Sequence, residues 1–277
     1  MSDLRRKYIL APTPCHFLPA VSETLGLKVW IKRDDQTGLA SGGNKTRKLE
    51  WLMADALKQG AGRIITAGAI QSNHCRQTAA AAAIEKLSCS LILSGAIPDI
   101  PNGNHLLDLV LGAEQNFCDA SERDEQMEAI AKRSADRGEK PYIIPIGGSN
   151  KYGAAAYIDA ILELSQQMPD TLPSRIILAS SSGGTQAGIV AGIKALNLPI
   201  LVTGIRIDKM QNERETYIDK MCRIANEALV LCGYQVHLSE SDFEVNCDYL
   251  GAGYGIMGAI EENAIKFLAQ NEGILLD

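Results

Sequence analysis

Short runs of apolar, mostly β-branched residues alternate with longer stretches of helical periodicity along this chain. The runs predict strands at 28–32, 63–66, 90–93, 142–145, 175–178 and 200–205. Their almost continuous apolar character is typical of parallel strands that are covered on both faces. The sequence therefore predicts an α/β protein in which helices cover parallel sheets.

Helical periodicity fills most of the chain between these strands. Leu49, Leu52, Met53, Ala56 and Leu57 follow the spacing of an amphipathic helix, which Gly60 then ends. Five consecutive alanines indicate a second helix at 73–86. Further helices are predicted at 122–137, 152–168, 185–195, 212–232 and 258–271.

The length of the chain predicts two lobes. It has 277 residues, more than the roughly 100–200 that are usual for one domain. Glycine-rich junctions at 41–44 and 147–150 bracket a block of the predicted strands, and we expect hinges at both. We therefore predict a small inserted domain at 48–147 and a large cofactor-binding domain formed by 1–47 and 148–277.

Composition narrows the classes of function. The formal net charge is −6 and no long basic run is present, so we expect no nucleic-acid partner. The first apolar run is too short for a secretory signal and no stretch is long enough to span a membrane, so we expect a cytoplasmic protein. The seven cysteines are scattered, which favours small buried side chains over a disulfide framework or a metal site.

A glycine-rich loop at 38–44 precedes Lys45 at the predicted start of a helix. Glycines let other groups approach the ammonium closely, and a lysine desolvated in this way serves as an amine nucleophile. Asn44 lies between Gly43 and Lys45 and breaks the G-K-[ST] spacing of a P-loop, so we expect no nucleoside triphosphate. The pattern also fits a solvated first turn of basic residues, although these oppose the helix dipole.

A second loop, at 67–72, follows the predicted strand at 63–66 and leads into the alanine-rich helix. Ser72 or Asn73 can cap that helix, and the free backbone N–H groups beyond the cap form a site for a carboxylate. Capping alone explains both residues equally well. The loop thus indicates either a plain helix cap or a site for the carboxylate of an amino acid.

A third loop, at 180–184, leads from the predicted strand at 175–178 into another helix. Its serines and glycines, together with Thr185, expose N–H and hydroxyl donors where a phosphate binds well; a plain glycine-rich turn is the alternative. The absence of G-x-G-x-x-G disfavours a dinucleotide. Together, a helix-initial lysine, a carboxylate site and a phosphate site match what a pyridoxal phosphate enzyme needs.

Specific motifs then link the chain to a known family. They are IKRDDQTG at 31–38, GGNKTRKLE at 42–50, GAIQSNH at 68–74, PIGGSN at 145–150 and SGGTQAG at 182–188. In this order they resemble the D-cysteine desulfhydrase and 1-aminocyclopropane-1-carboxylate (ACC) deaminase family, from about Pro12 to the end of the chain. The resemblance implies pyridoxal 5'-phosphate as cofactor and a homodimer. It also implies the tryptophan synthase β-like architecture of fold type II, with two open, twisted, mainly parallel sheets covered by helices.

The resemblance also assigns roles to residues of this chain. Lys45 would form the internal aldimine with the cofactor and remove the α-proton of the substrate, and Tyr254 would face the substrate as a further catalytic residue. An exposed surface tyrosine is the alternative for Tyr254. Ser72 would contact the substrate carboxylate and assist proton transfer, and Asn73 would bond to the phenolic oxygen of the cofactor. The implied phosphate site is Ser181, Ser182, Gly183, Gly184 and Thr185, and the implied substrate contacts are Ser72, Asn73 and His74.

His74 bears on the reaction. Desulfhydrase-like members read Ser-Asn-His at this place and ACC deaminases read Ser-Asn-Gln, so the resemblance implies α,β-elimination on D-cysteine, which yields pyruvate, sulfide and ammonia. The alternatives are ACC deamination to 2-oxobutanoate and ammonia, and a homologue that binds the cofactor or an amino acid without turnover. The loop GGNKTRK argues against a cysteine synthase.

The last residues of the chain also bear on the large domain. The stretch 274–277 resembles the strand that comes just before a family segment of the form Pro-Val-Tyr-Thr-Gly-Lys. That segment supplies a second active-site tyrosine in the family. We therefore expect the C-terminal part of the large domain to be missing.

Overall fold

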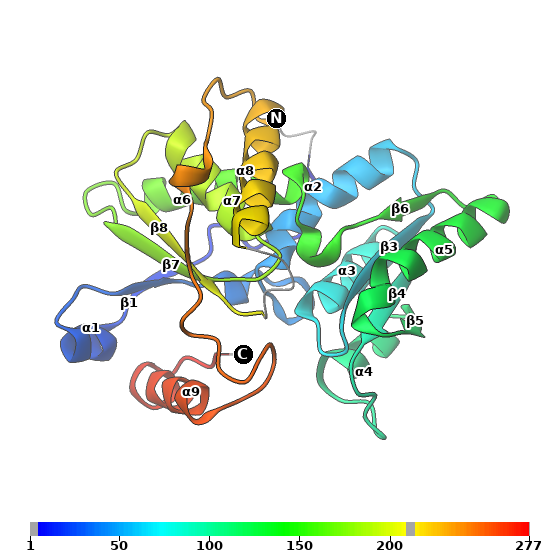
Figure 1. The fold of residues 1–277 in the computed structure, drawn as a ribbon, viewed down its shortest axis with the longest axis horizontal. Coiled ribbons are helices and arrows are strands. Elements are labelled where there is room, and N and C mark those ends of the chain that lie inside the picture. Colours follow the sequence, from blue (N-terminus) through cyan, green and yellow to red (C-terminus); the bar gives the residue numbers. More distant parts are fainter. Residues whose placement is uncertain (1–4, 209–213, 277) are drawn as a thin grey trace.

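Two separate parallel sheets organise the computed structural model, which describes residues 5–208 and 214–276 (Figure 1). The first sheet has the order β5-β4-β3-β6, and all its neighbouring strands are parallel. Its strands are β3 (Arg63–Ala69), β4 (Ser88–Ser94), β5 (Glu114–Phe117) and β6 (Pro141–Ile143). This sheet contains three predicted strands, and the polar β5 adds a fourth that hydrophobic periodicity did not reveal.

The second parallel sheet has the order β7-β8-β9. Its strands are β7 (Arg175–Ser180), β8 (Leu201–Arg206) and β9 (Glu244–Asn246). The helices α6, α7 and α8 lie on one side of it (Figure 1). The expectation that both faces are covered is wrong for β7 and β8, because Ile177 is 66% exposed and Leu201 is 58% exposed.

A third, two-stranded sheet corrects the prediction for 28–32. There, β2 (Trp30–Lys32) pairs antiparallel with β1 (Cys15–Phe17), so that Cys15 lies opposite Lys32. The connection between them is the short helix α1 (Pro19–Leu25), which ends at Gly26 in the left-handed conformation with a φ of 64°. Such a short connection joins antiparallel strands, whereas parallel strands need a longer crossover.

Helices occur at every predicted helical stretch, although the predicted start at 212 lies outside the described residues. They are α2 (Lys45–Lys58), α3 (Asn73–Ile84), α5 (Arg123–Asp136), α6 (Lys151–Gln167), α7 (Gly184–Ala195), α8 (Arg214–Leu231) and α9 (Ala259–Glu272). The prediction missed α1 and α4 (Gly103–Val110), which have only 7 and 8 residues. About two helical turns show too little periodicity to be recognised.

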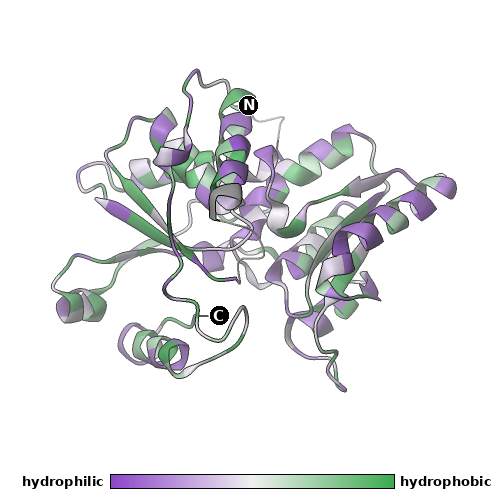
Figure 2. Ribbon diagram, viewed as in Figure 1, coloured by the Kyte–Doolittle hydropathy of each residue, from purple (hydrophilic) through white to green (hydrophobic). Residues whose placement is uncertain are grey.

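Three buried apolar clusters form the core of the described residues. The largest gathers the buried faces of α6, α7 and α8, the second packs α2 and α3 against β3 and β4, and the smallest packs α5 against β3 and β4. Figure 2 shows the corresponding hydrophobic sides of these helices. The helices α6 and α7 approach closely because α7 presents glycines, and a Cβ at Gly188 would lie 2.2 Å from the carbonyl oxygen of Ala154.

The two parallel sheets fall on opposite sides of the predicted domain boundary. All strands of the first sheet lie within 48–147 and all strands of the second within 148–277. The helix α2 packs against both α3 and α6, so it contacts both lobes. We keep the division into 1–47 with 148–277 and 48–147 as a proposal.

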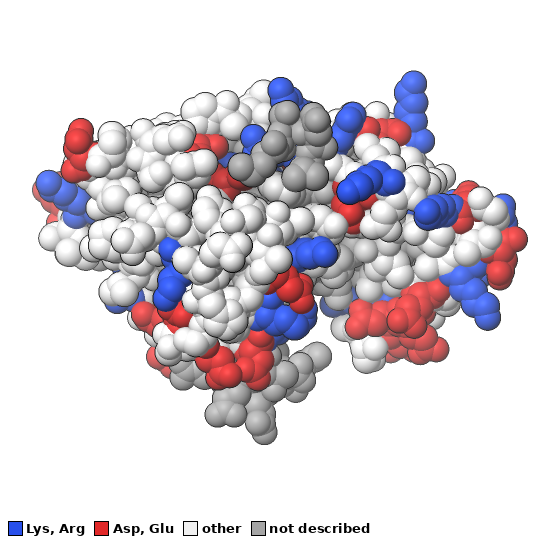
Figure 3. All heavy atoms as spheres, turned by 90° about the horizontal axis from the view of Figure 1, so that it is seen from above, with Lys and Arg blue, Asp and Glu red and all other residues white. Residues whose placement is uncertain are grey.

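The surface mixes charges of both signs. On the face seen in Figure 3, acidic side chains gather in a few clusters with basic side chains beside them.

The described cysteines are all free: Cys75 and Cys89 are buried, Cys15, Cys118, Cys222 and Cys232 are half-buried, and Cys247 is exposed. The prediction of buried cysteines is therefore correct for two of the seven. Among the described helices, none has the length and apolar character needed to cross a membrane.

Candidate active site

The lysine loop contacts the first turns of the helices that follow the other two loops. Arg76, on α3, donates from Nη2 to the carbonyl of Gly42 at 2.6 Å. Asn44 donates from Nδ2 to Oγ1 of Thr185, at the start of α7, at 3.5 Å. The fold therefore brings the lysine loop into contact with the helices that follow both of the other loops.

The glycines of the lysine loop are required by close packing. Gly42 and Gly43 have φ values of 75° and 127°, where other residues are strained. A Cβ at Gly42 would lie 2.0 Å from the carbonyl oxygen of Asp35, and one at Gly43 would lie 2.4 Å from Nε2 of Gln77. The loop is thus fixed between the segment that follows β2 and helix α3.

Lys45 is the first residue of α2 and is half-buried. Its Nζ donates to Oδ1 of Asn44 at 2.9 Å. The alternative of a solvated first turn is wrong for the two basic residues that follow, because Arg47 is 5% exposed and Lys48 is 1% exposed. The role of Lys45 toward the cofactor stays a prediction, which this half-buried position supports.

Ser72 caps α3. A helix cap was one of the two alternatives predicted for the second loop. Its Oγ accepts from the backbone N–H of Cys75 at 3.3 Å. A hydroxyl that accepts in this way keeps its own hydrogen for donation, so the cap leaves Ser72 able to bind a carboxylate. Asn73, the first residue of α3, is half-buried beside it. Their cofactor and substrate roles stay predictions.

His74 lies inside the small lobe with only 3% of its surface exposed. Its Nε2 is 2.9 Å from Oγ1 of Thr66, whose hydroxyl donates to the carbonyl of Ile144 at 2.8 Å. Because that hydroxyl hydrogen is already used, Nε2 is the donor and carries the ring proton. Burial, together with the positive charges of Lys45 and Lys48, lowers the pKa of His74 well below its usual value. The ring is therefore neutral, and direct contact with a substrate stays a prediction.

The third loop, at 180–184, is the predicted phosphate loop, and it also requires its glycines. A Cβ at Gly183 would lie 2.7 Å from Cγ of Met221, and one at Gly184 would lie 2.6 Å from Oγ of Ser149. Ser149 accepts from the N–H of Gly184 at 3.1 Å and donates to Oγ of Ser182 at 2.7 Å. Ser149, from the segment that joins the lobes, therefore contacts this loop, although no sequence pattern had assigned it a role.

Two further predicted site residues have other surroundings. Ser181 donates its hydroxyl to Oδ2 of Asp208 at 2.9 Å, so this hydrogen is engaged by a carboxylate. Tyr254 lies between β9 and α9 and is 55% exposed, which fits the alternative of a surface tyrosine. Their roles in phosphate binding and catalysis stay predictions.

Lys48 is a site residue that the sequence reasoning missed. Its Nζ donates to the carbonyl of Gly147 at 2.9 Å, and a Cβ at Gly147 would lie 2.3 Å from Oγ of Ser182. Burial and the nearby charge of Lys45 lower the pKa of Lys48 well below its usual value. No ion pair found among residues 5–208 and 214–276 includes Lys48. Burial disfavours the charged form of such an amine, and a bound anion beside it would favour that form again. Its spacing of three residues from Lys45, on one helix face, was the available signal.

Comparison with known proteins decides the family. A model of the family described as "Pyridoxal-phosphate dependent enzyme" matches residues 7–277. The chain belongs to this family of enzymes. The predicted cofactor, pyridoxal phosphate, is therefore confirmed at the level of the family.

Proteins of known activity and of known structure are similar to this chain. D-cysteine desulfhydrase of Salmonella typhimurium strain LT2 is 40% identical over 99% of this chain and 84% of that protein. D-cysteine desulfhydrase of Salmonella choleraesuis is 39% identical with the same coverage. A crystal structure of an ACC deaminase homologue has a TM-score of 0.90 at 36% identity, and covers 99% of this chain and 82% of that one. The predicted resemblance and the fold type II architecture are confirmed.

Proposed function

We propose that this enzyme catalyses the α,β-elimination of D-cysteine to pyruvate, sulfide and ammonia. The observation that carries the proposal is the 40% identity to a D-cysteine desulfhydrase over 99% of the chain. Ser72, Asn73 and His74 keep the Ser-Asn-His reading that favours elimination over ACC deamination. The position of Lys45 beside the phosphate and carboxylate loops supports the same conclusion.

The residues at the site suit pyridoxal phosphate. The buried amine of Lys48, which a bound phosphate would keep protonated, the N–H groups at the start of α7 and the hydroxyls of Ser182 and Thr185 make a donor set for a phosphate group. A side chain at position 183 or 184 would clash with neighbouring residues, so both positions need glycine. In this proposal Lys45 holds the cofactor covalently through Nζ, Asn73 binds its phenolic oxygen, and Ser181 supplements the phosphate site.

The bound cofactor would supply an electron sink for the carbanion that forms when a proton leaves Cα of the substrate. Lys45 would remove that proton with Nζ, which the Oδ1 atom of Asn44 holds at 2.9 Å. Ser72 would donate its hydroxyl hydrogen to the substrate carboxylate while its oxygen caps α3. Tyr254 would face the substrate. Loss of the thiolate from Cβ, followed by hydrolysis, gives pyruvate and ammonia.

A single set of measurements tests this function. The purified chain with pyridoxal phosphate should show a visible absorption band, and borohydride should then fix a mass adduct on the peptide that contains Lys45. D-cysteine should yield pyruvate and sulfide in equal amounts. The matched control is Lys151→Ala, because Lys151 also follows an asparagine at the first position of a helix, α6, but is exposed. Lys45→Ala should lose turnover and Lys151→Ala should keep it; turnover in Lys45→Ala would refute the proposal.

ACC deamination is the second candidate, favoured by the structural similarity to an ACC deaminase homologue. It would use Lys45 and Ser72 in the same places but release 2-oxobutanoate and ammonia without sulfide. Assays with D-cysteine and ACC in parallel separate the two reactions. An adduct on Lys45 without any product would instead identify a homologue that binds the cofactor without turnover.

We also propose that the enzyme works in the cytoplasm as a homodimer. The free cysteines suit a reducing compartment. Exposed apolar side chains such as Ile177 and Leu201 offer area for a subunit contact. Light scattering coupled to size exclusion, and fractionation of cells, test the two statements; a monomeric mass at micromolar concentration would overturn the dimer.

A further inference from the structure

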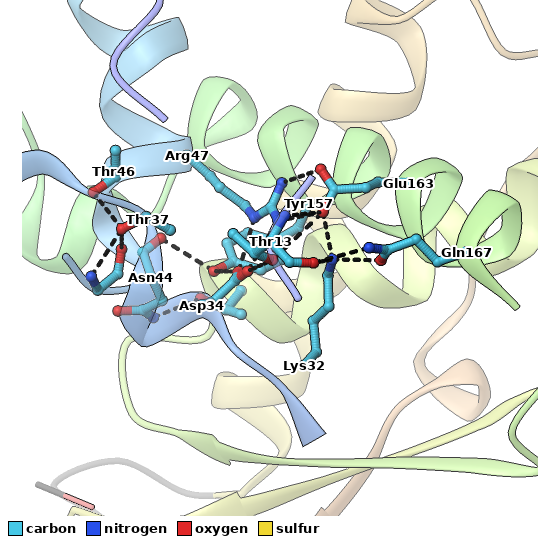
Figure 4. A network of polar contacts seen from close by, with 12 residues as sticks. Thr13, Lys32, Asp34, Thr37, Asn44, Thr46, Arg47, Tyr157, Glu163 and Gln167 are labelled. Carbon is cyan, nitrogen blue, oxygen red and sulfur yellow. Dashed lines mark hydrogen bonds and ion pairs between the residues drawn. The ribbon is translucent and has the colours of Figure 1, made fainter. Parts of the chain in front are cut away.

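A buried polar network adjoins the loop that carries Lys45 (Figure 4). At its centre, Arg47 donates from Nε and Nη2 to the two carboxylate oxygens of Asp34 at 2.8 and 2.9 Å. The same guanidinium donates from Nη1 and Nη2 to both oxygens of Glu163 at 3.1 and 2.8 Å. Lys32 also pairs with Glu163. Two cations thus balance two carboxylates, which buried charges require.

This network fixes the carboxylate of Asp34 tightly. Both of its oxygens accept from Arg47, and Oδ1 also accepts from the hydroxyl of Thr13 at 2.8 Å. Burial opposes ionisation of Glu163, but hydrogen bonds from Arg47 and Lys32 outweigh it and lower the pKa of Glu163 to about 2. Glu163 therefore stays ionised at neutral and mildly acidic pH.

Tyr157 connects the network to the lysine loop. The residue comes from α6 and is 4% exposed. Its hydroxyl lies 3.1 Å from Oδ2 of Asp34 and 3.1 Å from the carbonyl oxygen of Asn44. Both neighbours are acceptors, so the hydroxyl is the donor, and its single hydrogen is shared between them. Burial and the charge of Asp34 raise the pKa of Tyr157 well above its usual value, so the hydrogen is always present.

The carbonyl that Tyr157 holds belongs to the peptide between Asn44 and Lys45. The side chain of Asn44 accepts from Nζ of Lys45 at 2.9 Å and donates to Thr185 at 3.5 Å. On the preceding residue, Oγ1 of Thr37 bonds to both the N–H and the carbonyl of Gly43 at 2.9 Å. Buried hydroxyls therefore hold the two residues before Lys45: Tyr157 holds the carbonyl of Asn44, and Thr37 holds the backbone of Gly43.

We propose that Tyr157 is a positioning residue for Lys45. Its hydroxyl, oriented by the carboxylate of Asp34 and the guanidinium of Arg47, fixes the Asn44 carbonyl and thereby the direction of Nζ of Lys45. The inference rests on the proposed function, in which Lys45 binds the cofactor and removes the α-proton. Tyr157 touches neither substrate nor cofactor and acts only through Asn44.

The test compares two tyrosine variants on the same helix. Tyr157→Phe removes only the hydroxyl, and the control Tyr152→Phe removes a hydroxyl that donates to Asp55 at 2.7 Å, away from the lysine loop. In stopped flow, pyridoxal phosphate should react with Lys45 about tenfold more slowly in Tyr157→Phe than in wild type, the size expected for one hydrogen bond. Its kcat should fall by a similar factor with KM changed less than about twofold. Tyr152→Phe should keep the wild-type rates.

Other outcomes would overturn the inference in distinct ways. If both variants lose thermal stability equally and keep wild-type rates, Tyr157 is only structural. If Tyr157→Phe does not fold, Asp34→Asn takes its place, since loss of the charge on Asp34 should also slow the reaction of Lys45; unchanged rates in folded Asp34→Asn would refute the proposal. A wild-type chain that forms no adduct on Lys45 would refute the proposed function itself, and this inference with it.

Discussion

Asp108 has the most unusual carboxyl group outside the active site. It is fully buried on α4, and neither of its carboxylate oxygens has a hydrogen-bond partner among the described residues. Burial raises its pKa from 3.8 to about 7, against the opposing charge of Arg76. A raised pKa means that the protonated carboxyl stabilises the folded state, and that this stabilisation is lost as pH rises from about 4 to about 7.

The magnitude of this effect follows from the pKa change. At 1.36 kcal/mol per pH unit, ionisation of Asp108 costs the folded protein about 2 kcal/mol at pH 5 and about 4 kcal/mol at pH 8. Asp108→Asn replaces the acid with an uncharged group of the same shape. The stability advantage of the variant over wild type should therefore grow by roughly 2–3 kcal/mol between pH 5 and pH 8.

Urea unfolding at the two pH values measures this difference. Asp99→Asn is the matched control, because Asp99 is exposed and the substitution makes the same chemical change. The control should show no growing difference from wild type between pH 5 and pH 8. If the difference between Asp108→Asn and wild type is equal at both pH values, Asp108 does not titrate in this range and the reasoning is wrong.

Three further substitutions test the site and its support. Lys48→Met should weaken pyridoxal phosphate binding roughly tenfold, because it removes a buried amine that a bound phosphate would keep protonated; fluorescence titration measures this, and unchanged affinity would remove Lys48 from the site. Gly188→Ala should destabilise the protein by about 1–3 kcal/mol, since its Cβ would lie 2.2 Å from the Ala154 carbonyl; an unchanged thermal midpoint would contradict this packing. Arg47→Met should cost about 3–5 kcal/mol at pH 7 because it removes the cation paired with Asp34 and one of the two cations paired with Glu163. This last loss should shrink as the pH falls from about 4.5 toward 2, because the stability that Arg47 gives by holding Glu163 ionised is lost over that range; urea unfolding at pH 7 and pH 3 would show whether it does.

The sequence predicted correctly the elements whose own residues are mostly apolar and buried. The helix α3 was predicted from its alanine run, and the strands β3, β4 and β8 were predicted from their apolar stretches, because each buries one continuous surface. The glycine loops around Lys45 and Gly184 were also visible, since glycines just before a helix mark a tight turn that larger residues would strain. The short strand β9 and the polar β5 escaped because their neighbours in the sheet, and not their own residues, hold them in place.

Contacts between distant segments account for what the sequence did not reveal. Arg47 and Glu163 are 116 residues apart, and Lys48 and Gly147 are 99 apart. Nothing in the residues around Arg47 indicates that a carboxylate from α6 neutralises it, so a basic first turn looked solvated. The antiparallel pairing of β2 was missed for a related reason, because an apolar run does not state the direction of its partner.

The position of α2 has a consequence for attempts to divide the protein. The proposed boundary between residues 47 and 48 cuts α2 after its third residue, and the helix packs against both α3 and α6. An excised fragment 48–147 would lose the first turn of this helix, and the complementary fragment would keep Lys45 without the helix that holds it. The two lobes have separate sheets, but they share the helix α2. We therefore expect that the protein can be produced, refolded or permuted only as a single unit.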